Sequence, residues 1–151
     1  MKYVIVGCCR VGAALAEALD AEGHEVVVID LSTRAFDRLS SEFKGQAVRC
    51  DGTDEDVLRK AGVDGAAVLL ALTEGDNRNV MAAQVAMEKL NVAKAMAKIN
   101  DPVRAAAYAE LGIATVCRTT MLTDSNLSFL DMRATGMPSV IAPVPHVHVE
   151  A

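Results

Sequence analysis

A glycine-rich turn near the start of the chain restricts its fold more than any other feature. Residues 7–12 read Gly-Cys-Cys-Arg-Val-Gly, directly follow the mainly apolar segment 1–6, and begin a stretch with apolar residues at helical spacing. A second apolar run, residues 26–29, ends in Asp30, which lies 18 residues after Gly12. A buried strand, a glycine turn, a helix, a second strand and a carboxylate, in this order, predict a dinucleotide-binding βαβ unit.

The chemistry of such a unit explains why these residue types recur at this spacing. The turn lets backbone N–H groups at the helix N-terminus meet a pyrophosphate, where the helix dipole favours negative charge. Asp30 lies about where a carboxylate meets the hydroxyl pair of an adenosine ribose. Cys9 departs from the pattern, because it occupies the position of the second glycine. A side chain there hinders close approach of a phosphate, so the ligand is expected to sit differently or to bind more weakly.

Composition and charge predict one α/β domain with neither a nucleic-acid surface nor a membrane span. The 151 residues are 52% hydrophobic but only 3% aromatic, so the core is expected to consist of Val, Leu, Ile, Ala and Met. The net charge of −5 comes without a basic run, which argues against binding of nucleic acid. The longest apolar run, residues 66–72, is far too short for direct membrane insertion.

Cysteine usage and the first residues favour a cytoplasmic location. The four cysteines have neither metal-ligand spacing nor a C-x-x-C motif, so reduced thiols are expected. Residues 1–6 lack the apolar region and cleavage site of a signal peptide. Cys9 at a helix N-terminus has a position typical of reactive thiols, although a small residue tolerated in the turn is the simpler interpretation.

Alternating strand and helix patterns predict a doubly wound parallel sheet of six strands, of the Rossmann type. The strands are expected at residues 1–6, 26–29, 47–50, 66–72, 93–99 and 113–117. The helices are expected around residues 11–19, after a Ser32 cap, after a capping box at residues 53–56, around residues 80–90, from Pro102 behind the N-cap Asp101, and at about 120–133.

The proline-punctuated end of the chain predicts a change of character. Residues 1–134 are expected to form the nucleotide-binding domain, and residues 135–151 an irregular tail. His146 and His148 in this tail have a spacing found in metal sites, but tail histidines are more often solvated. No metal site is predicted.

Right-handed crossovers place the nucleotide crevice at the carboxyl ends of the first two strands, beside the fourth. Asp51 and Thr73 would fall on this same edge, which favours nucleotide binding over a glycine turn that binds nothing. Other interpretations stay open: Asp51 could simply cap the third helix, and Thr73 with Glu74 could be ordinary strand-end residues. Asn79 is expected to support the following helix rather than to contact ligand.

Residues 1–133 resemble the N-terminal lobe of the potassium-conductance regulator domain (the RCK, KTN or TrkA-N domain). This domain occurs in the cytosolic subunits of Trk- and Ktr-type potassium uptake systems. The segments that carry the resemblance are residues 7–12, 23–30, 50–54, 72–79, 98–102 and 111–113. A generic Rossmann dehydrogenase shares only the first two.

The resemblance implies an adenine nucleotide as ligand, either NAD⁺ or NADH or else ATP or ADP. The cofactor-binding residues that it implies are Gly7, Cys9, Arg10, Val11, Gly12, Asp30, Leu31, Asp51, Gly52, Thr53, Thr73, Glu74 and Lys98. Residues 10–12 would approach the phosphates, Asp30 the ribose, residues 51–53 the adenine, and residues 73–74 the floor near the phosphates. Lys98 stands where the family usually has Arg, and an ammonium lacks the bidentate fork of a guanidinium.

The resemblance also implies partners: a homodimer, higher rings, and a membrane potassium transporter or channel subunit. The helix expected near residues 120–133 carries more apolar surface than a terminal helix should expose, and in the family this segment crosses to a second subunit. The chain ends before the separate C-terminal lobe of most such subunits, so it is either an excised lobe or a naturally short member. A cytoplasmic location follows, peripheral to the inner face of the plasma membrane through the transporter.

Three classes of function compete. The favoured one is a nucleotide-sensing regulatory subunit that controls potassium uptake and is not an enzyme. A freestanding cytosolic NAD(H) or redox sensor shares the site and differs in its partner. The cofactor half of an NAD-dependent oxidoreductase is disfavoured, because His24 lies away from the expected nicotinamide end and neither Tyr3 nor Tyr108 is part of a Y-x-x-x-K motif.

Overall fold

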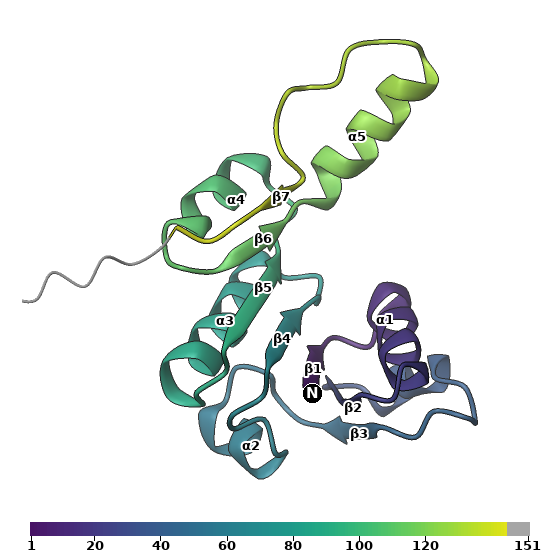
Figure 1. Cartoon of the computed structure of the whole chain (residues 1–151), viewed down its shortest axis with the longest axis vertical. Helices are drawn as coiled ribbons and strands as arrows, with labels where there is room; N and C mark the ends of the chain where they lie inside the picture. Colours follow the sequence, from purple (N-terminus) through teal and green to yellow (C-terminus); the bar gives the residue numbers. More distant parts are fainter. Residues whose placement is uncertain (145–151) are drawn as a thin grey trace, which may run out of the picture.

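Seven strands form one sheet in the computed structural model, which describes residues 1–144 (Figure 1). The strands are β1 Lys2–Val6, β2 Glu25–Asp30, β3 Gln46–Arg49, β4 Val68–Ala71, β5 Lys94–Lys98, β6 Ala114–Val116 and β7 Val140–Ile141. Their order is β3-β2-β1-β4-β5-β6-β7. Along the chain, β2 and β3 are therefore added on one side of β1, and β4 to β7 are then added on its other side. This reversal between β1 and β4 creates the crevice in which Rossmann-type folds bind ligands.

The helices lie between the strands in the order that the sequence predicts. They are α1 Arg10–Ala21, the 3₁₀ helix η1 Thr33–Arg38, α2 Glu55–Lys60, α3 Asp76–Lys89, α4 Pro102–Ala109 and α5 Arg118–Phe129. The start of α4 is as expected, because Asp101 Oδ1 accepts a hydrogen bond from the N–H of Val103 (2.9 Å) and Pro102 occupies the first turn.

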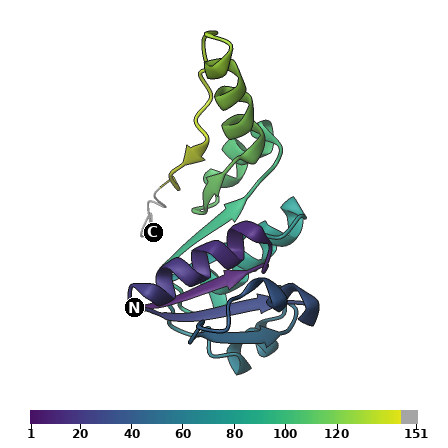
Figure 2. The same cartoon turned by 90° about the vertical axis from the view of Figure 1, so that its right-hand side faces the viewer.

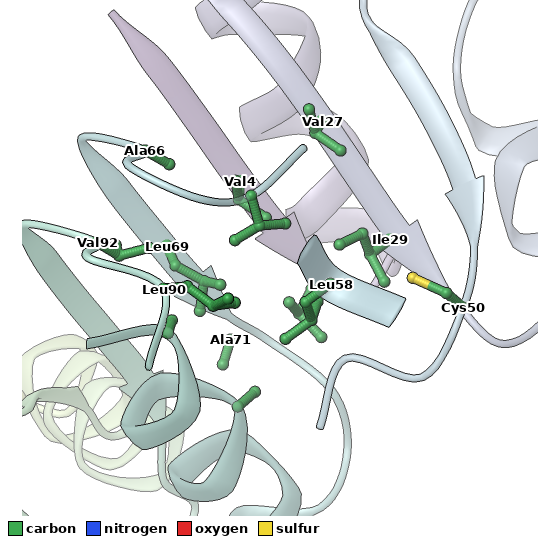
Figure 3. Close-up of a cluster of buried hydrophobic side chains, with 14 residues drawn as sticks. Val4, Val27, Ile29, Cys50, Leu58, Ala66, Leu69, Ala71, Leu90 and Val92 are labelled. Atoms are coloured by element: carbon green, nitrogen blue, oxygen red, sulfur yellow. The ribbon is translucent and has the colours of Figure 1, made fainter. Parts of the chain in front are cut away.

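Aliphatic side chains fill both faces of the sheet. Val4, Val27 and Leu69 lie on the face that α2 and α3 cover (Figure 3). Ile5 and Val28 point to the opposite face, towards α1 and η1. Burial on both faces explains why these strands read as continuous apolar runs rather than as alternating ones.

A seventh strand is the main departure from the predicted six. β7 pairs antiparallel with β6, so the sheet is mixed at this edge and residues 135–144 are not wholly irregular. The N–H of Cys117 donates to the carbonyl of Ser139 (2.7 Å), which extends the pairing by one bond. The flanking Pro138 and Pro143 are tolerated because β7 is an edge strand. His146 and His148 lie outside the described residues.

Two helix starts also differ from the prediction. The segment after Ser32 forms the short η1, without a capping bond from the Ser32 side chain. The following loop is instead tied to α1, because the N–H of Lys44 donates to Asp20 Oδ2 (2.9 Å). The N-cap of α2 is Asp54 rather than Thr53, since its Oδ1 accepts from the N–H of Val57 (3.1 Å). The Asp54 carboxylate thus makes the capping bond that the capping-box pattern predicted for Thr53, one residue earlier.

Helix α5 projects away from the body of the domain in both views (Figures 1 and 2). Thr120 is its one buried residue, and Phe129 at its end is 87% exposed. Among residues 1–144, no helix is both long and apolar enough to cross a membrane.

Candidate functional site

A cleft of about 320 Å³ lies at the carboxyl ends of β1, β2, β3 and β4, at the reversal of strand order. Seven of the predicted site residues line it: Gly7, Cys9, Asp30, Leu31, Gly52, Thr73 and Glu74. The other six, Arg10, Val11, Gly12, Asp51, Thr53 and Lys98, are not among its lining residues. The cleft is thus formed by the strand ends that the sequence indicated, with part of the predicted set around it rather than in it.

Two glycines of the turn are required by close backbone contacts. Gly7 has φ +109°, and a Cβ there would lie 3.0 Å from backbone atoms of Leu72 and Thr73. A Cβ on Gly12 would lie only 2.0 Å from the carbonyl oxygen of Gly7. The first glycine therefore permits the turn, and the second lets α1 pack directly against it.

Cys9 caps α1 with its side chain. Its Sγ accepts a hydrogen bond from the N–H of Gly12 (3.4 Å), and its S–H donates to the carbonyl oxygen of Leu72 (Sγ to O 3.5 Å). The thiol thus uses one of the N–H groups that the start of a helix leaves without a partner. The Gly12 N–H is one of the backbone donors at the start of α1 that would otherwise be free to face a phosphate. Its use by the Cys9 thiol is a physical reason to expect weaker or shifted binding.

Asp30 is held in place by two backbone N–H groups. Its Oδ2 accepts from the N–H of Cys8 (2.9 Å), and its Oδ1 accepts from the N–H of Ser32 (2.8 Å). Each carboxylate oxygen can accept a further hydrogen bond. The carboxylate is therefore oriented at the wall of the cleft with capacity left for the two hydroxyls of a ribose.

Asp51 stabilises the turn after β3 and does not cap α2. Its Oδ1 accepts from the hydroxyl (2.7 Å) and the N–H (2.9 Å) of Thr53. These bonds, the hydroxyl first, together with the nearby charge of Arg78, hold the pKa of Asp51 below its ordinary value. The interpretation that Asp51 caps the third expected helix, which is α2, is wrong, because Asp54 caps this helix.

Asn79 joins the ends of β4 and β5. The side chain is fully buried, and its Oδ1 accepts from the N–H (2.9 Å) and hydroxyl (2.6 Å) of Thr73. Its Nδ2 donates to the carbonyl oxygens of Thr73 (2.9 Å) and Lys98 (2.8 Å). As the sequence indicated, Asn79 supports the start of its helix, and it fixes the backbone of two predicted site residues.

Glu74 connects the cleft to two cations beyond it. Its Oε1 lies 3.4 Å from Nζ of Lys98, and its Oε2 lies 3.7 Å from Nη2 of Arg118. The Lys98 side chain is only 11% exposed, whereas that of Glu74 is 73% exposed. A buried ammonium is therefore neutralised by a carboxylate on the rim of the cleft.

Sequence reasoning missed two arginines that line the cleft. Arg38 ends η1, and its Nη1 lies 3.4 Å from the carbonyl oxygen of Cys8 as a donor. Arg78 reaches the cleft from the first turn of α3. Neither follows a strand directly, so strand-end position gave no signal for them. Both bring positive charge to a cleft that also contains Asp30 and Glu74.

Two cleft thiols, Cys8 and Cys50, are kept in their protonated form. Burial is the larger cause that raises the pKa of Cys8, and the charge of Asp30 adds to it. Burial likewise raises the pKa of Cys50, assisted by Asp51. Figure 3 shows Cys50 at the edge of the buried core. Within residues 1–144, no group of three or more His, Cys, Asp or Glu side chains is arranged to hold a metal ion.

Solved structures resemble this fold. The TrkA-N domain of the inner membrane protein ybaL from Escherichia coli superimposes with a TM-score of 0.74 at 24% identity, over 85% of this chain and 96% of that one. The GsuK channel bound to NAD superimposes with a TM-score of 0.69 at 20% identity, over 83% of this chain and 23% of that one. At these identities the likeness concerns the fold.

Sequence similarity gives the family. Residues 3–119 match the model of the TrkA-N domain. The Trk system potassium uptake protein TrkA of Streptomyces coelicolor is 46% identical over 127 residues, which are 84% of this chain and 57% of that protein. The chain spans 22% to 52% of the length of other relatives that carry the same or a similar description. The chain belongs to the TrkA-N domain family.

Proposed function

We propose that this chain is the nucleotide-binding part of a cytoplasmic regulatory subunit, which controls a potassium uptake system or channel by binding an adenine nucleotide. The observation that carries the proposal is the position of Asp30. Its oriented carboxylate lies beside the glycine turn in a cleft at the reversal of strand order. The potassium system in this proposal is inferred from the Trk relatives, and the ligand class from the GsuK channel bound to NAD.

The cleft suggests how such a ligand would lie. The adenosine ribose would meet Asp30 on β2, with the base towards Gly52 after β3. The phosphates would then cross the glycine turn towards Thr73 after β4. A negative carboxylate at the ribose disfavours a 2′-phosphate, so the ligands proposed are NAD⁺, NADH, ATP and ADP rather than NADP.

The proposed role is binding and signalling rather than catalysis. The raised pKa values of Cys8 and Cys50 favour their neutral thiols. Cys9, the thiol at the helix N-terminus, accepts a hydrogen bond from the N–H of Gly12, which supports a capping role for it over redox sensing. A freestanding nucleotide sensor would use the same cleft. Co-purification with a membrane potassium transporter, which would place the protein at the inner face of the plasma membrane, separates the two roles.

The proposal includes a homodimer formed through α5, with weaker association into rings. Exposed apolar side chains follow the helix and the residues after it: Met121, Leu122, Phe129, Leu130 and Met132. The chain offers a second apolar surface on the sheet face that α1 leaves uncovered, where Met96 and Val116 are only half-buried. Since α5 points away from that surface, a second copy is the occupant proposed for both.

Thermal melting with a panel of nucleotides tests the function. A ligand that binds only the folded state adds about 2.7 kcal/mol of stability at 100 times its Kd. At least one of ATP, ADP, NAD⁺ and NADH should raise the melting temperature, and NADPH should raise it least. Failure of all five at millimolar concentration would remove the basis of the proposal.

A further inference from the structure

Two arginines reach the cleft from helices on opposite faces of the sheet. Arg38 ends η1, which packs with α1 on one face, and Arg78 lies in the first turn of α3 on the other. Both side chains line the cleft at the carboxyl edge between these two faces. The two guanidinium groups therefore approach the same cleft from two sides.

Both arginines lie near the part of the cleft that is proposed for the base. Arg38 comes from the segment between β2 and β3, and its Nη1 lies 3.4 Å from the carbonyl oxygen of Cys8. Arg78 starts from α3, yet its charge is close enough to act on the Asp51 carboxylate in the turn after β3. Gly52, in that same turn, lines the cleft where the base would lie.

Neither arginine is neutralised by an ion pair. Within residues 1–144, no carboxylate pairs with either guanidinium. The charged residues that line the cleft are two cations, Arg38 and Arg78, and two carboxylates, Asp30 and Glu74, so their net charge is zero. A cleft without excess positive charge does not favour a polyanion at these arginines, whereas a guanidinium plane can stack on an uncharged aromatic ring.

The cleft itself offers a base no aromatic ring to stack on. Aromatic residues are only 3% of the chain, and among residues 1–144 no Phe, Tyr, Trp or His lines the cleft. Proteins that recognise unpaired bases stack them on aromatic side chains or on the guanidinium planes of Arg. Arg38 and Arg78 are therefore the lining side chains suited to cover the two faces of a base.

We infer that Arg38 and Arg78 hold the base of the bound nucleotide between their guanidinium planes and thereby select a purine. The inference rests on the proposed nucleotide site and adds the residues that recognise the base. Asp30 and the glycine turn would contact ribose and phosphate, which purine and pyrimidine nucleotides share. A purine presents a larger ring surface than a pyrimidine, so this arginine pair discriminates where the other contacts do not. Both side chains are exposed in the unliganded protein, which leaves them able to close on a base.

Calorimetric titration of the full chain with AMP, ATP and UMP tests the arginine pair. AMP and UMP share their ribose and phosphate, so the ratio of their affinities isolates the base. The wild type should bind AMP about tenfold more tightly than UMP, since a cation–π contact at an exposed site supplies roughly threefold. Arg38→Ala combined with Arg78→Ala should bring this ratio to about one, and each single substitution should reduce it about threefold. AMP and ATP should lose affinity by the same factor, because they share the base.

Lysine at both positions separates the guanidinium plane from its charge. Arg38→Lys combined with Arg78→Lys keeps both charges without the plane, and should reduce the ratio almost as far as the two alanines do. Lysine would instead serve well if the arginines only attracted a phosphate. Arg34→Ala is the matched control, because Arg34 is an exposed arginine on η1 that does not line the cleft, and it should leave the ratio unchanged. Circular dichroism should show that every variant folds, as expected for exposed side chains.

The outcomes separate this inference from the proposed function. If the ratio of AMP to UMP affinity is the same in the double alanine variant as in the wild type, or if the double lysine variant retains the wild-type ratio, the arginine pair does not hold the base and the proposed function stands. A greater loss for ATP than for AMP would assign the arginines to the phosphates and would also overturn the inference, as would an equal loss of the ratio in Arg34→Ala. If the wild type binds neither these nucleotides nor NAD⁺ or NADH, both the inference and the proposed function are wrong.

Discussion

Replacement of Asp30 by alanine should reduce both nucleotide affinity and the stability of the unliganded protein. A carboxylate at a strand end, considered alone, would be expected to affect binding only. In the structure, however, Asp30 accepts from the N–H groups of Cys8 (2.9 Å) and Ser32 (2.8 Å). Alanine leaves both donors without this acceptor, and Cys8 belongs to the buried core.

The two effects have different magnitudes. A hydrogen bond to a charged group contributes about 1.5–3 kcal/mol, and the bond to the exposed Ser32 is at the weak end. With two such bonds lost, we therefore expect a loss of about 3 kcal/mol in the free energy of unfolding, which corresponds to a decrease of roughly 6–12 °C in Tm. Loss of the contacts from Asp30 to a ribose should weaken binding at least tenfold, or about 1.4 kcal/mol.

Differential scanning calorimetry of the free protein and isothermal titration with the best nucleotide measure the two quantities separately. Asp37→Ala is the matched control, because Asp37 is an exposed carboxylate on η1 with no side-chain hydrogen bond within residues 1–144. The control should change neither value appreciably. A lower Tm with an unchanged Kd would refute the ribose assignment, and an unchanged Tm would refute the structural role of the two hydrogen bonds.

Three further predictions concern other parts of the molecule. Asn79→Ala removes the four hydrogen bonds of a fully buried side chain and should lower the free energy of unfolding by about 3 kcal/mol or more in urea melts; a change below about 1 kcal/mol would contradict this. Phe129→Asp combined with Leu130→Asp should give a monomer or insoluble protein by light scattering, whereas a wild-type monomer at tens of micromolar would exclude the dimer. The pKa of Asp51 is lowered in the folded state, so its stabilisation is complete above its ordinary pKa of 3.8 and is lost as pH falls through the lower folded value. Thr53→Ala should raise this pKa in an NMR titration, and no change would exclude the Thr53 hydroxyl as the main cause.

Features that depend on neighbouring residues were predictable from the sequence. The glycine turn, the start of α1, the Asp101–Pro102 helix start and the apolar strands each follow from local sterics, capping or burial on both faces. The order of strand ends followed too, because crossover handedness leaves few topologies for alternating strands and helices. These features were sufficient to place Gly7, Asp30 and Thr73 at one edge of the sheet.

Features that depend on distant residues were decided only by the tertiary structure. β7 is two residues long and exists because the edge of β6 offers unpaired backbone groups. Arg38 reaches the cleft because η1 brings it to the carbonyl oxygen of Cys8 in the glycine turn. Glu74 meets Arg118 because β4 and β6, which flank β5, run parallel and end at the same edge of the sheet. No spacing in the chain encodes these contacts, since each depends on segments that are far apart in sequence. The sequence thus determined where a nucleotide cleft should form, whereas packing between distant segments determined which charges surround it.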